Sequence, residues 1–317
     1  MLKKDKTILI TGVTGFVGSC LARHLIKNNF SNVNTIIREN SNRWRIRDIE
    51  DKLKIYKCDL LENLKLLKII SEIKPEVIFH LATHGSFTKT QNDAKQIYKT
   101  NLFGLINLLS ACAKVDFELF VNTGSSSEYG KKSRPMEETD LLEPYNDYGI
   151  SKASATLYCQ NFSLKNKLQI VTLRLFSPYG YYDDKQRLIP YLILSCLNYD
   201  VPIILKPTAV RDYIFIEDVI DSYIKTMDLK NIYGQIFNVG SGKQYIIKEV
   251  VEKIINLFKI DVEPELYCNN DLDDESPVWI SNNQKTNEAL GWYPINSLDQ
   301  GLEKSIDWFK QNLNLYK

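Results

Sequence analysis

Short apolar runs alternate with helical patterns through residues 7–175 of this 317-residue chain. The runs are rich in Ile and Val, as expected of strands that are covered by helices on both faces. They occupy residues 7–11, 33–37, 55–58, 76–81, 117–122 and 169–175. The clearest helical pattern spans 92–114, where apolar side chains recur every three or four residues. This alternation predicts an α/β fold with a doubly wound parallel sheet.

The alternation breaks after Phe176. The stretch SPYGYYDDKQR is polar and rich in turn residues, and LIPYLILSCL then has the character of a buried helix. RDYIFIEDV and QIFNVG resemble strand ends that return to the main sheet. We therefore predict two closely packed parts with a cleft between them. The main domain comprises 1–176 with 211–240, and a smaller C-terminal region comprises 177–210 and 241–317.

Composition argues against several classes of protein. Hydrophobic residues make up 44% and charged residues 25%, an ordinary globular balance, and a net charge of +1 gives no basis for binding nucleic acid or membranes. The run TILI after the basic start is too short for a signal peptide, and no run approaches the roughly 18 residues that span a bilayer. Six scattered cysteines fit a reducing compartment better than a disulfide framework. We expect a cytoplasmic protein.

His80 and His84 have the i, i+4 spacing of a metal-binding pair. They flank the end of a predicted strand, however, and no third ligand stands out. A zinc site needs at least three protein ligands. A structural or substrate-side role is the better interpretation, and we expect no bound metal.

The turn TGVTGFVG follows the first predicted strand and precedes a helical pattern. Gly12 permits a tight turn, Gly15 lets the backbone approach a pyrophosphate, and Gly18 lets the helix pack closely on the strand. The free N–H groups at the start of the helix attract phosphates. The spacing GxxGxxG differs by one residue from the common fingerprint, but its strand–turn–helix context is the required one. The sequence therefore predicts a Rossmann-like fold whose dinucleotide is held by Gly12, Thr14, Gly15, Phe16, Val17 and Gly18.

The end of the second strand bears on the choice between NAD and NADP. An NAD site usually places Asp or Glu there to accept a hydrogen bond from the ribose 2′-hydroxyl. This chain has Arg38, whose guanidinium suits a 2′-phosphate, followed by Glu39 as an alternative acidic partner. Arg38 on a solvated face, merely ending the strand, is the remaining interpretation. We favour NADP, with NAD as the alternative.

Tyr148 and Lys152 stand four residues apart at the start of a predicted helix and so share one of its faces. A phenol with its ordinary pKa of about 10 is a poor proton shuttle at neutral pH. An ammonium roughly 4 Å away would stabilise the phenolate by about 4 kcal/mol at an effective dielectric of about 20, which lowers the pKa to about 7. We predict that Tyr148 exchanges a proton with a substrate oxygen, while Lys152 lowers its pKa and holds the nicotinamide ribose.

A hydroxyl partner is expected where the fifth strand ends. Ser125, Ser126 and Ser127 follow Gly124 at that point. One of these hydroxyls would hold the substrate oxygen against the phenol. A YxxxK spacing is common in helices by chance, but its combination with the glycine-rich turn and the serine turn favours an active site.

Several motifs occur in a fixed order along the chain. They are TGVTGFVG, HLAT, the helix with Asn101, NTGSSSEYG, YGISK, RLFSPYG and RDYIFIEDV. Together they resemble the extended short-chain dehydrogenase/reductase family, also described as the NAD-dependent epimerase/dehydratase family, whose members act on nucleotide-diphosphate sugars. The likeness covers nearly the whole chain. It implies that the smaller region binds the nucleotide sugar, and that helices at 92–114 and 151–166 form a homodimer interface.

The resemblance implies roles for further residues. Around the cofactor these are Asp59 and Leu60 at the adenine, Leu81, Ala82 and Thr83 along the cavity, Asn101 behind the catalytic residues, and Pro178 near the nicotinamide. The catalytic hydroxyl falls on Ser125, four residues before Tyr129. The substrate contacts are His84, Ser126, Ser127, Ser177, Arg187 and Arg211. Ser177 stands where the family often has Asn, and DDESPVW lacks the family's second arginine, for which Arg187 is a substitute.

Three reactions share such a site: 4-epimerisation, 4,6-dehydration and 4-keto reduction. Dehydratases carry acidic residues directly after the catalytic hydroxyl, where this chain has Ser126 and Ser127, with Glu128 one residue late. A reductase that consumes NADPH agrees with Arg38. LIPYLILSCLN and ISNNQKTNEALGWYP also resemble, more weakly, the abequose and paratose synthase type of 4-ketoreductase.

We therefore predict an NADPH-dependent 4-ketoreductase of a nucleotide-linked deoxysugar. The alternative is an NAD-dependent 4-epimerase of the UDP-sugar type. A non-catalytic cofactor-binding module is less favoured, because such modules usually lose the tyrosine or the lysine, and both are present here.

Overall fold

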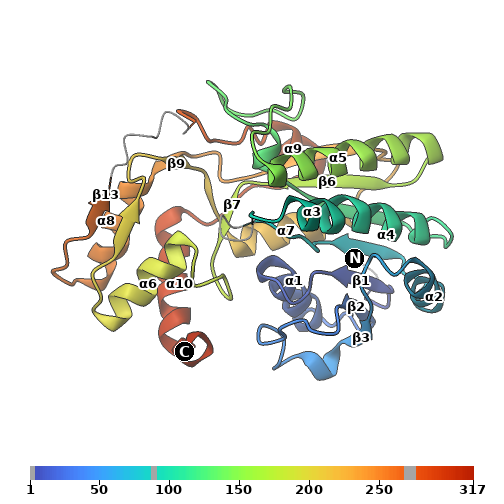
Figure 1. Ribbon diagram of the computed structural model, residues 1–317, viewed down its shortest axis with the longest axis horizontal. Coiled ribbons are helices and arrows are strands. Elements are labelled where there is room, and N and C mark those ends of the chain that lie inside the picture. The colour runs from blue at the N-terminus through green and yellow to red at the C-terminus, as the bar shows by residue number, and fades with distance from the viewer. Residues whose placement is uncertain (1–3, 87–90, 268–275) are drawn as a thin grey trace.

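The computed structural model, which describes residues 4–86, 91–267 and 276–317, is built around a seven-stranded sheet (Figure 1). Every strand pairs in parallel with its neighbours in the order β11-β6-β5-β4-β1-β2-β3. The strands are β1 (Ile8–Thr11), β2 (Val33–Ile37), β3 (Lys54–Lys57), β4 (Val77–His80), β5 (Leu119–Ser125), β6 (Ile170–Leu175) and β11 (Gln235–Val239). The predicted fold class is confirmed, and the six predicted strands all form close to their predicted ends.

The strand order places the topological switch point between β1 and β4. Ile8 of β1 lies opposite Val33 of β2 on one side and Val77 of β4 on the other. Connections lead outward from β1 in both directions, so the carboxyl ends of β1 and β4 border a crevice. The glycine-rich turn after β1 and the residues after β4 therefore meet at one edge of the sheet.

Helices cover both faces of the sheet, as the Ile- and Val-rich strands predicted. Ile8 and Ile10 of β1 belong to the core on one face, whereas Leu9 belongs to the core on the other. The first face is covered by α1 (Phe16–Lys27) and α7 (Ile216–Thr226), and the second by α2 (Asn63–Ile73), α4 (Gly104–Cys112) and α5 (Asp147–Asn166).

The predicted helix at 92–114 is a continuous helical segment with one irregular turn. α3 (Ala94–Tyr98) passes through a π-helical turn, Lys99–Phe103, into α4. Such wide turns are rare and gather at functional sites. This one carries Asn101, whose side chain is buried against the start of α5.

The smaller region lies to the left of the sheet in Figure 1 and holds the predicted buried helix, α6. Its core is continuous with the apolar core under α1 and α7. Its helices are α6 (Leu188–Asn198), α8 (Ile247–Phe258) and α10 (Leu298–Gln311), and α9 (Gln284–Leu290) packs near β11. Its two-stranded pairs are β7 (Ser177–Tyr179) with β10 (Tyr213–Phe215), β8 (Ile203–Leu205) with β13 (Glu265–Tyr267), and β9 (Val210–Arg211) with β12 (Tyr245–Ile246).

Two segments were predicted to return to the main sheet, and one does. Gln235–Val239 pairs with β6 as β11, whereas Tyr213–Phe215 pairs with β7 outside the sheet. β11 already occupies the edge beside β6. β10 therefore pairs with β7, the short strand that follows β6 in the chain. The acidic stretch of residues 269–277 falls mostly outside the described residues. Within the described part of the chain, no helix combines the length and the apolar character needed to cross a membrane.

Candidate active site

The glycine-rich turn closes tightly over the end of β1. Gly12 has a φ of +77°, and a Cβ there would lie 2.5 Å from the backbone nitrogen of Ala82. A Cβ at Gly18 would lie 2.3 Å from the carbonyl oxygen of Gly12. Both positions therefore need glycine, one for the turn and one for the close approach of the helix. α1 starts after Gly15 with no side-chain cap and no acidic residue in its first turn, so its N–H groups suit an anion.

A cavity of about 200 Å³, which we call the cofactor cavity, lies at the switch point. Its walls come from the ends of β1, β2, β3 and β4. Of the residues predicted to bind the cofactor, it is lined by Gly12, Thr14, Gly15, Arg38, Asp59, Leu60, Leu81, Ala82 and Thr83. Ser41, Lys99 and Thr100 also line it and were not predicted. A cavity lined by the glycine-rich turn beside the start of a helix fits a dinucleotide.

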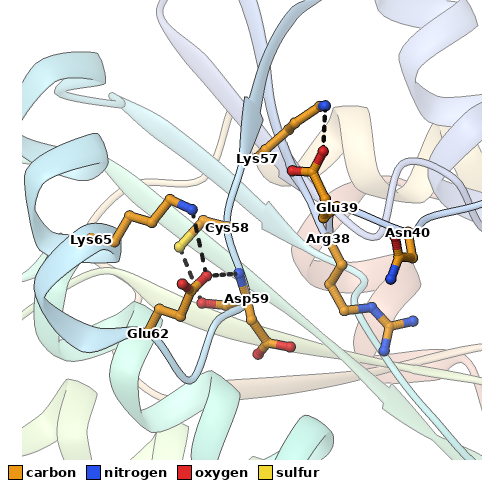
Figure 2. A pocket seen from close by; sticks show the side chains of 8 residues that line it. All are labelled: Arg38, Glu39, Asn40, Lys57, Cys58, Asp59, Glu62 and Lys65. Atoms are coloured by element: carbon orange, nitrogen blue, oxygen red, sulfur yellow. Dashed lines mark hydrogen bonds and ion pairs between the residues drawn. The ribbon is translucent and has the colours of Figure 1, made fainter.

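Arg38 and Glu39, the two candidate contacts of the adenosine ribose, lie at the outer end of the cofactor cavity and point in different directions. Lys57 Nζ donates a hydrogen bond to Glu39 Oε1 at 2.6 Å. Figure 2 shows the Arg38 side chain extending on the opposite side from this pair. The Arg38 backbone N–H donates to Ser41 Oγ at 3.1 Å, which brings that hydroxyl to the same end of the cavity. Arg38 lines this end of the cofactor cavity, and the pocket that Figure 2 shows there is lined by Arg38 together with Glu39, which pairs with Lys57 at the surface.

A second cavity, of about 450 Å³, shares the glycine-rich turn with the first and is called the catalytic cavity. It is lined by all three predicted catalytic residues, Ser125, Tyr148 and Lys152. The predicted cofactor residues Phe16, Val17, Gly18 and Pro178 line it as well. The structure thus brings together residues that lie more than a hundred positions apart in the sequence.

The start of α5 explains the spacing of the NDYGISK stretch. Asn146 caps the helix by accepting a hydrogen bond from the Gly149 N–H at 2.8 Å. A Cβ at Gly149 would lie 2.6 Å from the carbonyl oxygen of Ser127, so glycine lets the helix approach the serine turn. Tyr148 then lies in the first turn of α5 and Lys152 in the next.

Tyr148 lies near two hydroxyl groups. The side chains of Ser125 and Thr83 lie close enough to the phenol to lower its pKa. Ser125 Oγ also accepts from the Ser127 N–H at 3.1 Å, which leaves its own O–H to donate. Lys152 is buried, and its Nζ donates to the Thr123 carbonyl oxygen at 2.9 Å.

Burial governs the protonation of this pair. It raises the pKa of Tyr148, and the Glu128 carboxylate raises it further, against the lowering effect of Ser125, Arg187 and Thr83. Burial lowers the pKa of Lys152 to about 8, although Glu128 acts in the opposite direction. The prediction that Lys152 brings the phenol toward neutrality is wrong here. Its ammonium is 6.0 Å from the Tyr148 ring centre and is bound to Thr123.

Asn101 does not line the cofactor cavity. Its Oδ1 accepts from the His84 N–H at 2.8 Å, and its Nδ2 donates to the His84 carbonyl at 2.9 Å and to Ser151 Oγ at 2.9 Å. It therefore ties the segment after β4 to α5, directly behind Tyr148. The resemblance implied this place behind the catalytic residues, and the π-helical turn provides it.

The two histidines have different surroundings. His80 is buried, its Nδ1 lies 2.7 Å from Thr11 Oγ1, and burial lowers its pKa to about 3, so the ring is neutral. His84 lines neither the catalytic cavity nor the cofactor cavity, although Ser86 lines the former. Among the described residues, no group of three or more His, Cys, Asp or Glu side chains is arranged to hold a metal ion.

The predicted substrate residues Ser126, Ser127, Ser177, Arg187 and Arg211 line the catalytic cavity, as does the glycine-rich turn. Arg187 and Arg211 also line a third cavity of about 720 Å³, the outer cavity, with Lys206 and several apolar side chains. The guanidinium of Arg211 lies 5.5 Å from the ring centre of Trp279. Two cationic forks therefore stand where the catalytic and outer cavities meet.

Sequence reasoning missed Asp183. This side chain is 1% exposed, lines both the catalytic and outer cavities, and has one carboxylate oxygen without a hydrogen-bond partner. Its other oxygen lies 3.7 Å from Arg187 Nη1. Burial raises its pKa to about 6. The pair Asp183–Asp184 after a turn was visible in the sequence, but nothing local indicated burial.

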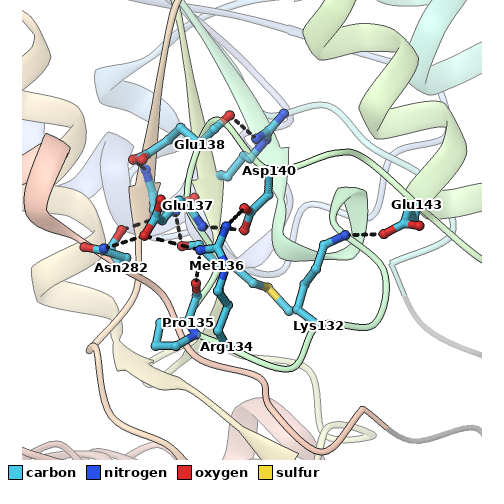
Figure 3. A network of polar contacts seen from close by, with 11 residues as sticks. Lys132, Arg134, Pro135, Met136, Glu137, Glu138, Asp140, Glu143 and Asn282 are labelled. Carbon is cyan, nitrogen blue, oxygen red and sulfur yellow. Dashed lines mark hydrogen bonds and ion pairs between the residues drawn. The ribbon is translucent and has the colours of Figure 1, made fainter.

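Residues 129–146 connect the serine turn after β5 to α5, the helix that contains Tyr148. Polar contacts hold this connector (Figure 3). Lys132 pairs with Glu143, and Arg134 pairs with Asp140. Asn282, from the C-terminal part of the chain, donates to Glu137 Oε1 at 3.3 Å. The two ion pairs lie within the connector, and Asn282 joins it to the C-terminal part of the chain.

Comparisons with known proteins agree with this arrangement. The sequence model of the NAD dependent epimerase/dehydratase family matches residues 8–240. The dTDP-4-dehydro-6-deoxyglucose reductase of Escherichia coli is 28% identical over 313 residues, which cover 94% of this chain and 96% of that protein.

Two solved structures resemble this one over nearly the whole chain. UDP-glucose 4-epimerase with UDP-glucose from Thermotoga maritima has a TM-score of 0.89 and 25% identity, and the match covers 97% of this chain and 99% of that chain. UDP-glucuronic acid 4-epimerase from Bacillus cereus, in complex with UDP-glucuronic acid and NAD, has a TM-score of 0.85 and 26% identity, and the match covers 96% and 99%.

Asp183→Asn is expected to stabilise the protein in a pH-dependent way. The folded pKa of about 6 lies above the unfolded value of about 3.9, so ionisation of Asp183 costs folding free energy. The cost is absent below about pH 4, develops between about pH 4 and 6, and is complete above that range. The variant should therefore gain up to about 3 kcal/mol near pH 7.5 and nothing near pH 4 in urea unfolding. Asp184→Asn, which removes the neighbouring carboxylate, should give no such gain. An equal effect at both pH values would contradict the assignment.

Proposed function

Since this chain is an enzyme of the NAD dependent epimerase/dehydratase family, we propose that it is an NADPH-dependent reductase of the 4-keto group of a nucleotide-diphosphate deoxysugar. The observation that carries this choice is the cation at the end of β2. Arg38 lines the cofactor cavity, whereas Glu39 is bound by Lys57. The similarity to the Escherichia coli dTDP-4-dehydro-6-deoxyglucose reductase supports the same choice.

Arg38 and Ser41 are the proposed contacts of the 2′-phosphate. A guanidinium makes charge-assisted hydrogen bonds to phosphate oxygens, and a hydroxyl adds a neutral donor. Glu39, the carboxylate that would recognise a 2′-hydroxyl in an NAD site, points to Lys57 on the side away from Arg38. A reductase consumes its reduced cofactor in each turnover, and a preference for NADPH agrees with that use.

The catalytic residues suit proton delivery to a carbonyl oxygen. The dinucleotide supplies the hydride when it is bound. Tyr148 donates the proton to the oxygen at C4, because its raised pKa keeps the phenol protonated at neutral pH. The Ser125 hydroxyl donates a hydrogen bond to the same oxygen and holds it beside the phenol. Lys152, whose pKa is about 8, places its own ammonium group near Tyr148 and Ser125.

The substrate end suits a nucleotide diphosphate. Arg187 and Arg211 stand where the catalytic and outer cavities meet, and a guanidinium matches a diphosphate in charge and geometry. This arrangement supports a sugar in the catalytic cavity, a diphosphate at the arginines and a base in the outer cavity. We propose the matching division of the chain. Residues 1–176 with 211–240 form the dinucleotide domain, and residues 177–210 and 241–317 form the region that binds the sugar nucleotide.

Dehydration is less favoured. It needs an acid–base pair beside the catalytic hydroxyl, and Ser126 and Ser127 occupy those positions. Glu128 is fully buried in an ion pair with Arg174 and does not line the catalytic cavity. The second candidate is a 4-epimerase that uses NAD, which is favoured by the likeness to the Thermotoga maritima enzyme over nearly its whole length.

The decisive experiment follows cofactor absorbance. Purified protein is mixed with NADPH and dTDP-4-keto-6-deoxyglucose, with the CDP- and UDP-linked analogues in parallel. We expect loss of NADPH in equal amount to the alcohol formed. Tyr148→Phe removes the proton donor and should lower turnover by about 10²- to 10⁴-fold while cofactor binding persists. Tightly held NAD, with interconversion of C4 epimers and no net cofactor change, would overturn the reductase in favour of the epimerase.

Arg38→Ala should reverse the cofactor preference. Loss of one charge-assisted contact to the 2′-phosphate is worth about 1.5–3 kcal/mol, so KM for NADPH should rise roughly 10- to 100-fold. KM for NADH should change little, because NADH lacks that phosphate. Arg43→Ala is the matched control, since Arg43 lies in the same loop and pairs with Glu50. An equal loss for both cofactors would contradict the proposed contact.

We also propose a homodimer through the helices α3–α4 and α5. Ile150, Leu157 and Leu164 recur every seven residues on α5 and are 39%, 54% and 59% exposed, and Phe103 between α3 and α4 is 52% exposed. Leu157→Glu should convert the dimer to a monomer in sedimentation analysis, because the charge would be buried in an apolar interface. Leu64→Glu on α2, where the leucine is 87% exposed, should leave the dimer intact. A monomeric unmodified protein would refute the proposal.

A further inference from the structure

Glu128 lies directly beneath the serine turn, in the 3₁₀ turn Ser126–Glu128 that follows β5. Its side chain is fully buried, and Oε2 accepts a hydrogen bond from Arg174 Nε at 2.8 Å. Arg174 lies in β6 and is 1% exposed. The two side chains therefore form an ion pair that is shielded from water, and neither lines the catalytic cavity.

The carboxylate also binds the backbone of the catalytic serine. The Ser125 N–H donates to Glu128 Oε1 at 2.8 Å, so each carboxylate oxygen receives one donor. A Cβ at Gly124 would lie 2.6 Å from Glu128 Oε1, which means that the carboxylate fills the space below the turn. Ser125 is the last residue of β5 and lies opposite Leu175 of β6, and the Glu128 carboxylate adds a further hold on its backbone.

Arg174 is itself fixed from several sides. Its guanidinium lies 4.6 Å from the ring centre of Tyr129. The Tyr129 hydroxyl donates to Asn238 Oδ1, on β11, at 2.6 Å. The ion pair is therefore connected to β5, β6 and β11.

A gain in folding stability does not by itself explain the buried ion pair of Glu128 and Arg174. Two buried charges lose hydration that their attraction only partly returns, and well-packed apolar residues of similar volume often serve stability as well or better. The carboxylate lies close enough to Tyr148 and Lys152 to raise the pKa of both groups. Four other titratable or charged groups interact electrostatically with Tyr148 or Lys152 from the elements packed around them. They are His80, Arg187, Tyr223 and Cys159.

We propose that Glu128 is a positioning residue for the proton transfer: held by its ion pair with Arg174, it fixes the backbone of the catalytic Ser125 through the Ser125 N–H. The same buried carboxylate adds a negative charge near Tyr148 and Lys152. The inference rests on the proposed function only in taking Tyr148 as the proton donor. The geometric part, the hold on Ser125, does not depend on which sugar nucleotide is the substrate.

The first test is Glu128→Gln, which removes the charge and keeps the shape. The tyrosinate absorbance of Tyr148 is obtained as the difference between each protein and its Tyr148→Phe counterpart. Loss of the carboxylate should lower the titration midpoint by on the order of one pH unit. This titration needs no substrate, so it separates failure of the inference from failure of the proposed reaction. In turnover, the alkaline limb of the pH profile should move in the same direction.

The matched control is Asp218→Asn. Asp218 is also a buried carboxylate, and it accepts from the backbone N–H groups of Ile295 and Asn296 at 3.1 Å, in the C-terminal part of the chain. Its loss should cost stability without moving the Tyr148 titration. If Glu128→Gln moves the midpoint no more than this control, the electrostatic part of the inference is overturned.

The double variant Glu128→Met with Arg174→Met covers the case in which a lone buried arginine prevents folding. Both charges leave together, so the protein should fold, but the Ser125 N–H loses its acceptor. We expect kcat to fall about 10- to 100-fold, because small displacements of a catalytic group are costly, while cofactor affinity is retained. A folded double variant with unchanged kcat would overturn the positioning role.

Discussion

All seven strands of the main sheet run parallel, so their carboxyl ends and the turns that follow them meet at one edge. The cofactor cavity and the serine turn depend on this constraint, whereas Arg187 and Arg211 come from outside the main sheet. The glycine turn after β1, Arg38 after β2, Thr83 after β4 and Ser125 at the end of β5 arrive at the same edge because their strands point the same way. α5 then lies across one face with its N-terminus at that edge, which places Tyr148 in the cavity that Ser125 and Thr83 also line.

The low polarity of this edge decides the proton chemistry. Burial raises the pKa of Tyr148 and lowers that of Lys152, so the phenol holds its proton and the ammonium is close to releasing one. The Glu128 carboxylate opposes the effect on the lysine and strengthens the effect on the tyrosine. A group below the turn, outside the cavity, thus influences the reaction through a medium that screens charge poorly.

Cations at opposite ends of the cavities suit two anionic ligands. Arg38 lies at the far end of the cofactor cavity, and Arg187 and Arg211 lie where the catalytic cavity opens into the outer cavity. The catalytic residues stand between these ends. An extended dinucleotide and a nucleotide sugar that enter from opposite directions would meet beside Tyr148, and this geometry is shared by the reductase and epimerase reactions. The choice between them therefore depends on how the cofactor is held and exchanged.

Sequence alone determined the features that depend on near neighbours. Strand runs, the glycine turn and the four-residue spacing of Tyr148 and Lys152 follow from periodicity and turn chemistry, and the predicted strands, fold class and family are confirmed. Only the tertiary structure decided which distant groups meet. It paired Glu39 with Lys57, placed Tyr213–Phe215 beside β7, buried Asp183, and joined Glu128 to Arg174. A lone arginine in the apolar run QIVTLRL was a visible signal, but its partner was not. Burial and pairing depend on packing between remote segments, which local patterns do not encode.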